Sequence, residues 1–126
     1  MEQEKVQSYK DLIVWQKAMN LVVEIYAITE KFPQQELYVL TSQMRRAAVS
    51  IPSNIAEGRR RGTRKDYRQF LLIAYGSGSE FETQIEIAKR LSLGKSVDFS
   101  QADLHLDEVM RMLNVMVHKL GSQPTS

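Results

Sequence analysis

Apolar residues recur at intervals of three and four along four stretches of the chain, the spacing of one face of an α-helix. This pattern predicts helices over residues 12–31, 36–57, 63–91 and 100–120, with short polar tails at the two ends. No stretch shows the strict alternation of a half-buried strand. We therefore expect an all-α fold, an antiparallel up-down four-helix bundle.

The first predicted helix is more apolar than a monomeric bundle requires. Its apolar residues form two stripes, each with helical spacing: Leu12, Trp15, Met19, Val22 and Tyr26, and Val14, Ala18, Leu21, Ile25 and Ile28. Two interpretations stay open. Part of the helix packs against another subunit, or the whole helix lies deep in the core.

Five local signals predict where the helices start, stop and approach one another. Asp11 is placed to cap the first helix, and Thr63, followed by Asp66, resembles a capping box for the third. Pro52 predicts a kink or a break in the second helix, and Gly58 predicts its end. The run of small residues at 76–79 predicts close approach of a neighbouring helix, because glycine within a helix is otherwise costly.

Size and composition indicate a single globular domain spanning residues 1–126. Of the 126 residues, 43% are hydrophobic and 25% charged, which excludes disordered and collagen-like chains. Because the chain contains no cysteine, disulfide frameworks and thiolate zinc sites are excluded. It also lacks an apolar run long enough to span a membrane, so we expect a cytoplasmic protein without membrane contacts.

The charge distribution is uneven although the net charge is only +2. Residues 45–68 carry a net charge of +6, and the remainder carries −4. The candidate nucleic-acid-binding residues are Arg59, Arg60, Arg61, Arg64, Lys65 and Arg68, with Arg45 and Arg46 as supports. Guanidinium groups bind phosphate in a bidentate manner, and a helix N-terminus favours an anion. The alternative is a solvated loop whose arginines pair with acidic residues elsewhere in the bundle.

The sequence offers no catalytic constellation, cofactor motif or metal site. A di-iron bundle needs two Glu-x-x-His motifs, whereas the residues three before His105 and His118 are Ala102 and Val115. Glu57 and Glu80 lie in otherwise small or apolar stretches. We expect them to be buried partners for arginines such as Arg45 or Arg46. No aromatic residue alternates with the clustered arginines, so binding through charge and shape is expected, without base recognition.

Three blocks carry a family resemblance: YKDLIVWQKA at 9–18, SIPSNIAEG at 50–58 and FLLIAYGS at 70–77. Together they resemble the bacterial four-helix-bundle family of proteins encoded in intervening sequences of large-subunit rRNA genes. The resemblance runs from about residue 9 to residue 120, nearly the whole chain. It implies a ring-like homopentamer with a basic, nucleic-acid-binding surface and no established catalytic activity. A more distant similarity is to the accessory protein of diversity-generating retroelements, which partners a reverse transcriptase and its RNA.

The combined hypothesis is a non-enzymatic, oligomeric bundle that binds RNA or DNA through phosphate contacts. If five subunits repeat the basic segment around a ring, modest attraction at each becomes multivalent. The competing hypothesis is a protein-interaction scaffold or accessory subunit whose arginines bind an acidic partner or a neighbouring subunit, with no role for nucleic acid.

Overall fold

A computed structural model describes residues 8–91, 93, 95 and 97–122 of the chain. It contains the four α-helices α1 (Ile13–Thr29), α2 (Ser42–Arg60), α3 (Arg64–Arg90) and α4 (Ser100–Ser122). A 3₁₀ turn at Tyr9–Asp11 precedes α1, and no strand occurs among the described residues. The all-helical prediction is confirmed, whereas the polar ends predicted at 1–7 and 123–126 lie outside the described residues.

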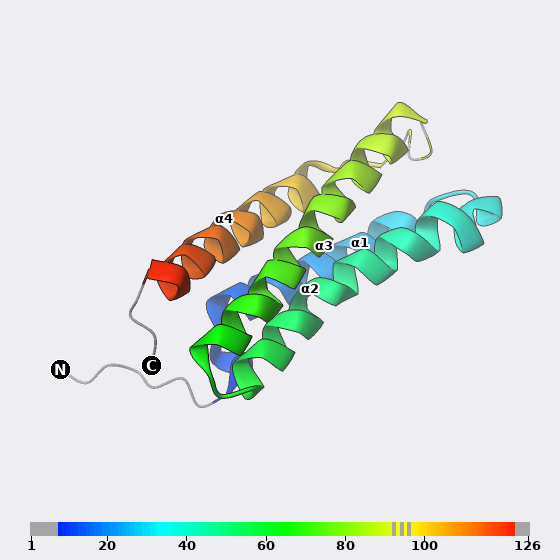
Figure 1. Cartoon of the computed structure of the whole chain (residues 1–126). Coiled ribbons are helices and arrows are strands. Elements are labelled where there is room, and N and C mark those ends of the chain that lie inside the picture. The colour runs from blue at the N-terminus through cyan, green and yellow to red at the C-terminus, as the bar shows by residue number, and fades with distance from the viewer. Residues whose placement is uncertain (1–7, 92, 94, 96, 123–126) are drawn as a thin grey trace.

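The helices are arranged as an up-down bundle in which each packs against two neighbours (Figure 1). α1 contacts α2 and α4, and α3 contacts the same two helices. The start of α1, the turn between α2 and α3 and the end of α4 lie at one end of the bundle, which we call the turn end. The α1–α2 and α3–α4 connections lie at the opposite end.

The core fills the space between the helices with one apolar face from each. From α1 it takes only the second predicted stripe, whose five residues are each at most 4% exposed. The first stripe is half-buried or exposed, and Val23 beside it is 67% exposed. A deep core position for the whole helix is therefore wrong. α1 keeps an apolar surface outside the core, as the subunit-contact interpretation requires.

The cap predicted for the first helix belongs to the preceding turn. Ser8 accepts a hydrogen bond from the Lys10 backbone N–H at 3.0 Å, and the Asp11 carboxylate accepts one from the Ser8 N–H at 3.1 Å. Leu12 is the N-cap of α1 and provides no side-chain cap. The side-chain cap is Ser8, three residues before Asp11, and Asp11 is the third residue of the same capping box.

α2 begins six residues later than predicted, because the predicted first turns are not α-helical. A 3₁₀ turn (Gln34–Glu36) and a π-helical turn (Leu37–Thr41) precede it. The wider π turn leaves Tyr38 89% exposed while burying Leu40 and Thr41. From Ser42 the helix runs unbroken past Pro52, which is buried inside it, so the predicted break is wrong.

The turn between α2 and α3 uses a different glycine from the one predicted. α2 continues through Gly58 to Arg60, and Gly62 adopts the left-handed backbone, with φ +90°. At Gly58 an added Cβ would lie 2.7 Å from the Phe70 Cβ, so this glycine allows α2 and α3 to meet. Thr63 then caps α3 by accepting from the Asp66 N–H at 3.1 Å, as predicted.

The small residues at 76–79 meet neighbouring helices at two positions. A Cβ at Gly78 would clash with the Met110 Sδ of α4, which confirms the predicted close approach there. Ser77 Oγ lies 2.8 Å from Ser50 Oγ of α2. Gly76 is exposed, with nothing within 4 Å of an added Cβ, so close packing does not explain it.

Candidate nucleic-acid interface

Several cationic side chains are exposed at the turn end of the bundle, among them Arg59, Arg60 and Lys65. Arg59 and Arg60 lie on the last turn of α2, and Lys65 lies on the first turn of α3. The Arg60 guanidinium carbon lies 5.1 Å from the centre of the Tyr9 ring. Within the described part of the chain none of the three forms an ion pair, so their charges are available to a ligand. We call Arg59, Arg60 and Lys65 the basic turn.

Arg61 is adjacent in sequence but already has partners. Its Nε donates to the Glu57 carboxylate at 3.1 Å, and its guanidinium carbon lies 4.9 Å from the centre of the Phe70 ring. Both members of the ion pair are about half exposed, at 49% and 52%. The pair is therefore weak, but the nearby carboxylate reduces the net charge that Arg61 offers to a phosphate.

Arg64 is partly withdrawn into a recess beside the turn. This hollow, about 140 Å³ in volume, is lined by Gly58, Arg59, Gly62, Thr63, Arg64 and Tyr67. The Arg64 Nη2 and the Tyr67 hydroxyl are buried without a hydrogen-bond partner among the described residues. Burial raises the pKa of Tyr67 above its usual 10.0, partly offset by the charge of Arg59. Arg64 contributes charge close to the basic turn but offers less of its guanidinium to solvent.

Arg68 stabilises the end of α4. Its Nε donates to the Val117 carbonyl at 3.0 Å, and its guanidinium covers Gly121, where an added Cβ would lie 2.8 Å from Nε. The last carbonyls of a helix lack intrahelical donors, and a cation there also opposes the negative end of the helix dipole. The predicted ligand-binding residue therefore has a structural role between α3 and α4.

Arg45 and Arg46 are remote from the basic turn. They precede Arg59 by 14 and 13 residues on α2, which corresponds to about 21 Å along the helix at 1.5 Å per residue. Arg45 donates to Thr29 at 2.8 Å, and Arg46 donates to Ser42 at 3.4 Å. The structure thus divides the eight candidate residues between separate places instead of forming one patch.

The predicted burial of Glu57 and Glu80 is wrong. Both are exposed; Glu57 pairs with Arg61, and Glu80 accepts a hydrogen bond from Gln84 at 3.4 Å. Both residues lie on the exposed faces of their helices. The small and apolar residues beside them in the sequence led to the prediction of burial. Across the described residues no three His, Cys, Asp or Glu side chains gather as metal ligands would.

Sequence reasoning missed the aromatic residues beside the arginines. Tyr9, Tyr26 and Phe70 lie under Arg60, Arg45 and Arg61, at 4.5 to 5.1 Å from ring centre to guanidinium carbon. These pairs bring together residues 9 to 51 positions apart, so no local alternation reveals them. Such cation–π contacts hold the guanidinium groups in defined orientations.

The comparisons with known proteins agree with this fold. The sequence model of the 23S rRNA-intervening sequence protein family matches residues 10–115. A solved structure from Bacteroides thetaiotaomicron, described as a protein with unknown function from the S23 ribosomal protein family, superposes with a TM-score of 0.71. It is 21% identical and covers 83% of this chain and 98% of its own. No curated protein sequence matches significantly. None of the helices in the described part of the chain has the length and hydropathy of a membrane span.

Proposed function

The chain belongs to the 23S rRNA-intervening sequence protein family, and from this premise we propose that it is a non-enzymatic, cytoplasmic homo-oligomer that binds RNA or DNA through phosphate contacts. The basic turn makes the principal contacts, with Arg64 as a neighbouring charge. Sequence readout is weak, because phosphate contacts position a protein on nucleic acid without distinguishing bases.

The observation that carries the proposal is the exposed charge of the basic turn, which forms no ion pair among the described residues. Arg59, Arg60 and Lys65 flank a tight turn and lack ion pairs within the described part of the chain. Lys65 lies in the first turn of the 27-residue helix α3, whose N-terminal end favours an anion. An exposed cation without an ion-pair partner can bind a phosphate of the nucleic acid and release the counterion bound there.

The exposed apolar surface of α1 supports self-association. Met19, Tyr26 and Val23 are exposed, and Trp15 and Val22 line a hollow of about 300 Å³ between α1 and α2. Burying this surface against another subunit removes apolar area from water. The family resemblance implies a ring-like homopentamer. Such a ring would repeat the basic turn once per subunit, so that weak phosphate contacts combine into multivalent binding.

The test compares two charge-matched triple variants by fluorescence anisotropy with structured RNA and duplex DNA at low and physiological salt. The first replaces Arg59, Arg60 and Lys65 with glutamine. The control replaces Lys31, Arg90 and Lys95, exposed cations near the opposite end of the bundle. Because log affinity for duplex DNA changes with log salt by about 0.9 per neutralised phosphate, the first variant is expected to lower the slope by about 2 to 3. The control is expected to leave the slope nearly unchanged.

Light scattering is measured on the same samples. A monomeric mass at micromolar concentration for the unmodified protein would refute the oligomer. Loss of nucleic-acid binding with an unchanged oligomer supports the proposal, whereas loss of the oligomer in the first variant assigns the basic turn to subunit bridging. If the unmodified protein binds neither ligand at low salt, the nucleic-acid proposal fails and the protein-interaction scaffold is favoured.

A further inference from the structure

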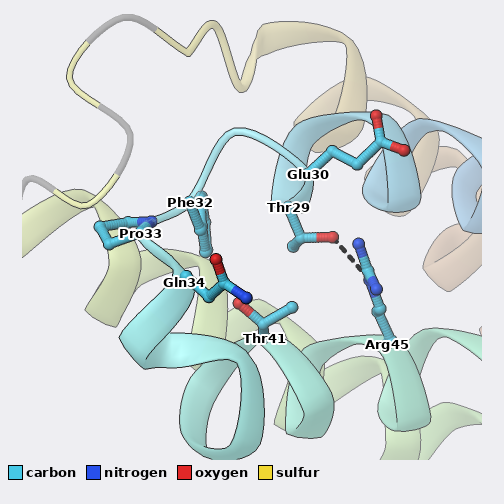
Figure 2. A pocket seen from close by; sticks show the side chains of 7 residues that line it. All are labelled: Thr29, Glu30, Phe32, Pro33, Gln34, Thr41 and Arg45. Carbon is cyan, nitrogen blue, oxygen red and sulfur yellow. Dashed lines mark hydrogen bonds between the residues drawn. The ribbon is translucent and has the colours of Figure 1, made fainter.

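A polar pocket lies at the end of the bundle opposite the basic turn. It has a volume of about 290 Å³ and opens between the end of α1, the following connection and the start of α2. Its walls include Thr29, Phe32, Pro33, Gln34, Thr41 and Arg45. Figure 2 shows Arg45 rising from α2 on one side of this space, with Phe32, Pro33 and Gln34 on the opposite side.

Arg45 is held in one orientation by two contacts. Its Nε donates to Thr29 Oγ1 at 2.8 Å, and its guanidinium carbon lies 4.5 Å from the centre of the Tyr26 ring. Thr29 is itself fixed, because its hydroxyl donates to the Ile25 carbonyl at 2.7 Å. Neither Nη nitrogen of Arg45 has a partner within the described part of the chain. The guanidinium is therefore preorganised to donate from its remaining edge, formed by the two Nη groups, to a carboxylate.

Thr41 provides an independent sign of a ligand. Its side chain is 2% exposed, it lines the pocket, and its Oγ1 has no hydrogen-bond partner among the described residues. A buried hydroxyl without a partner destabilises the folded state. The Arg45 guanidinium and the Thr41 side chain thus border one pocket, and Figure 2 shows the Thr41 hydroxyl turned towards Gln34 and its methyl group towards Arg45.

The remaining walls limit the class of ligand. Phe32 is buried and Pro33 half-buried, so the connection presents apolar atoms beside the polar groups. Glu30 also borders the pocket, although its carboxylate turns away from Gln34 and Thr41 (Figure 2). A negative charge at the rim opposes a doubly charged phosphate more strongly than a singly charged group. A small monocarboxylate with a short apolar body fits this combination best.

We propose that this pocket binds a small monocarboxylate, whose carboxylate accepts hydrogen bonds from the Nη groups of Arg45 while its apolar part contacts Phe32 and Pro33. The site differs from the basic turn in position, chemistry and ligand size. It does not depend on the proposed nucleic-acid function, and it can be measured without nucleic acid.

The experiment titrates the full chain, labelled at its threonine methyl groups, with benzoate and separately with inorganic phosphate. The methyl NMR signals of Thr29 and Thr41 report on the pocket. Thr63 and Thr83, which lie elsewhere, serve as internal references. We expect benzoate to shift the two pocket signals saturably and phosphate to bind more weakly. A shift that fails to saturate, or one shared equally by Thr63 and Thr83, would overturn the proposal.

Three substitutions assign the contacts. Arg45→Gln is expected to weaken benzoate binding at least tenfold, while Arg46→Gln, a change in the adjacent residue that does not line the pocket, leaves it unchanged. Arg45→Lys retains the charge without the planar fork, so it guards against misfolding of the glutamine variant and is expected to weaken binding as well. Equal affinity in the Arg45 and Arg46 variants would refute the assignment.

Discussion

Two glycines in the bundle are expected to respond oppositely to the same substitution. Gly58 in α2 faces α3, where an added Cβ would lie 2.7 Å from the Phe70 Cβ and 3.3 Å from the Tyr67 carbonyl oxygen. Gly76 in α3 is exposed, with nothing within 4 Å of an added Cβ. Both adopt helical backbone, so alanine reduces the conformational entropy of the unfolded chain at each position.

The expected magnitudes follow from these contacts. Replacing a helical glycine with alanine adds up to about 1 kcal/mol to the free energy of unfolding, so Gly76→Ala is expected to gain about 1 kcal/mol. At Gly58 the same gain opposes an overpacking cost of about 1 to 3 kcal/mol. The opposing atoms are a Cβ and a backbone oxygen, which cannot move without shifting α3. We expect Gly58→Ala to lose up to about 2 kcal/mol, which separates the two variants by about 1 to 3 kcal/mol.

The assay is urea unfolding followed by far-UV circular dichroism, at one protein concentration because an oligomer's stability depends on concentration. Light scattering on each variant checks that the subunit number is unchanged. Equal stabilisation of both variants would refute the close packing of α2 against α3 at Gly58. A loss at Gly76 without a change in mass would show that its exposed environment is described wrongly.

Three further substitutions test other contacts. Tyr67→Phe removes an unpartnered hydroxyl and is expected to raise the free energy of unfolding by about 1 kcal/mol at neutral pH, measured by urea unfolding. The pKa of Tyr67 in the folded state lies above its usual 10.0. The part of the free energy of unfolding that depends on this hydroxyl staying protonated is therefore fully present below pH 10 and is lost as the pH rises further. Tyr67→Phe is expected to lack this loss of stability above pH 10. Parallel curves of unfolding free energy against pH for the two proteins would contradict this expectation. Arg68→Met is expected to lower the free energy of unfolding by about 1 to 2 kcal/mol and to speed amide hydrogen exchange at the end of α4. The salt dependence of its RNA affinity is expected to stay near that of the unmodified protein. Thr63→Ala should cost about 1 kcal/mol, and no measurable loss would refute its role as the cap of α3.

The sequence predicts the two ends of α2 wrongly, because the residues there are compatible with more than one local structure. Apolar and polar signals around residues 34–41 fit an α-helix equally well, but the chain there forms 3₁₀ and π turns that bury Leu40 and Thr41. Gly58 has the sequence signature of a helix end, yet it serves helix contact, and Gly62 takes the left-handed position. A glycine suits both a helix end and a close contact between helices, so only the position of α3 shows which role Gly58 has.

Hydrophobic periodicity alone predicted the four helices, because a 3.6-residue repeat constrains each helix independently of its neighbours. The tertiary structure decided which of the two apolar stripes of α1 is buried. The sequence also identified the cluster of positive charge. Only the tertiary structure decided that Arg68 turns to the end of α4 and Arg45 to a pocket beside Thr29 and Thr41, whereas the Arg61–Glu57 pair is a local contact between residues four apart at the end of α2. The partners of Arg68 and Arg45 belong to other helices, so these contacts arise only when the bundle is assembled.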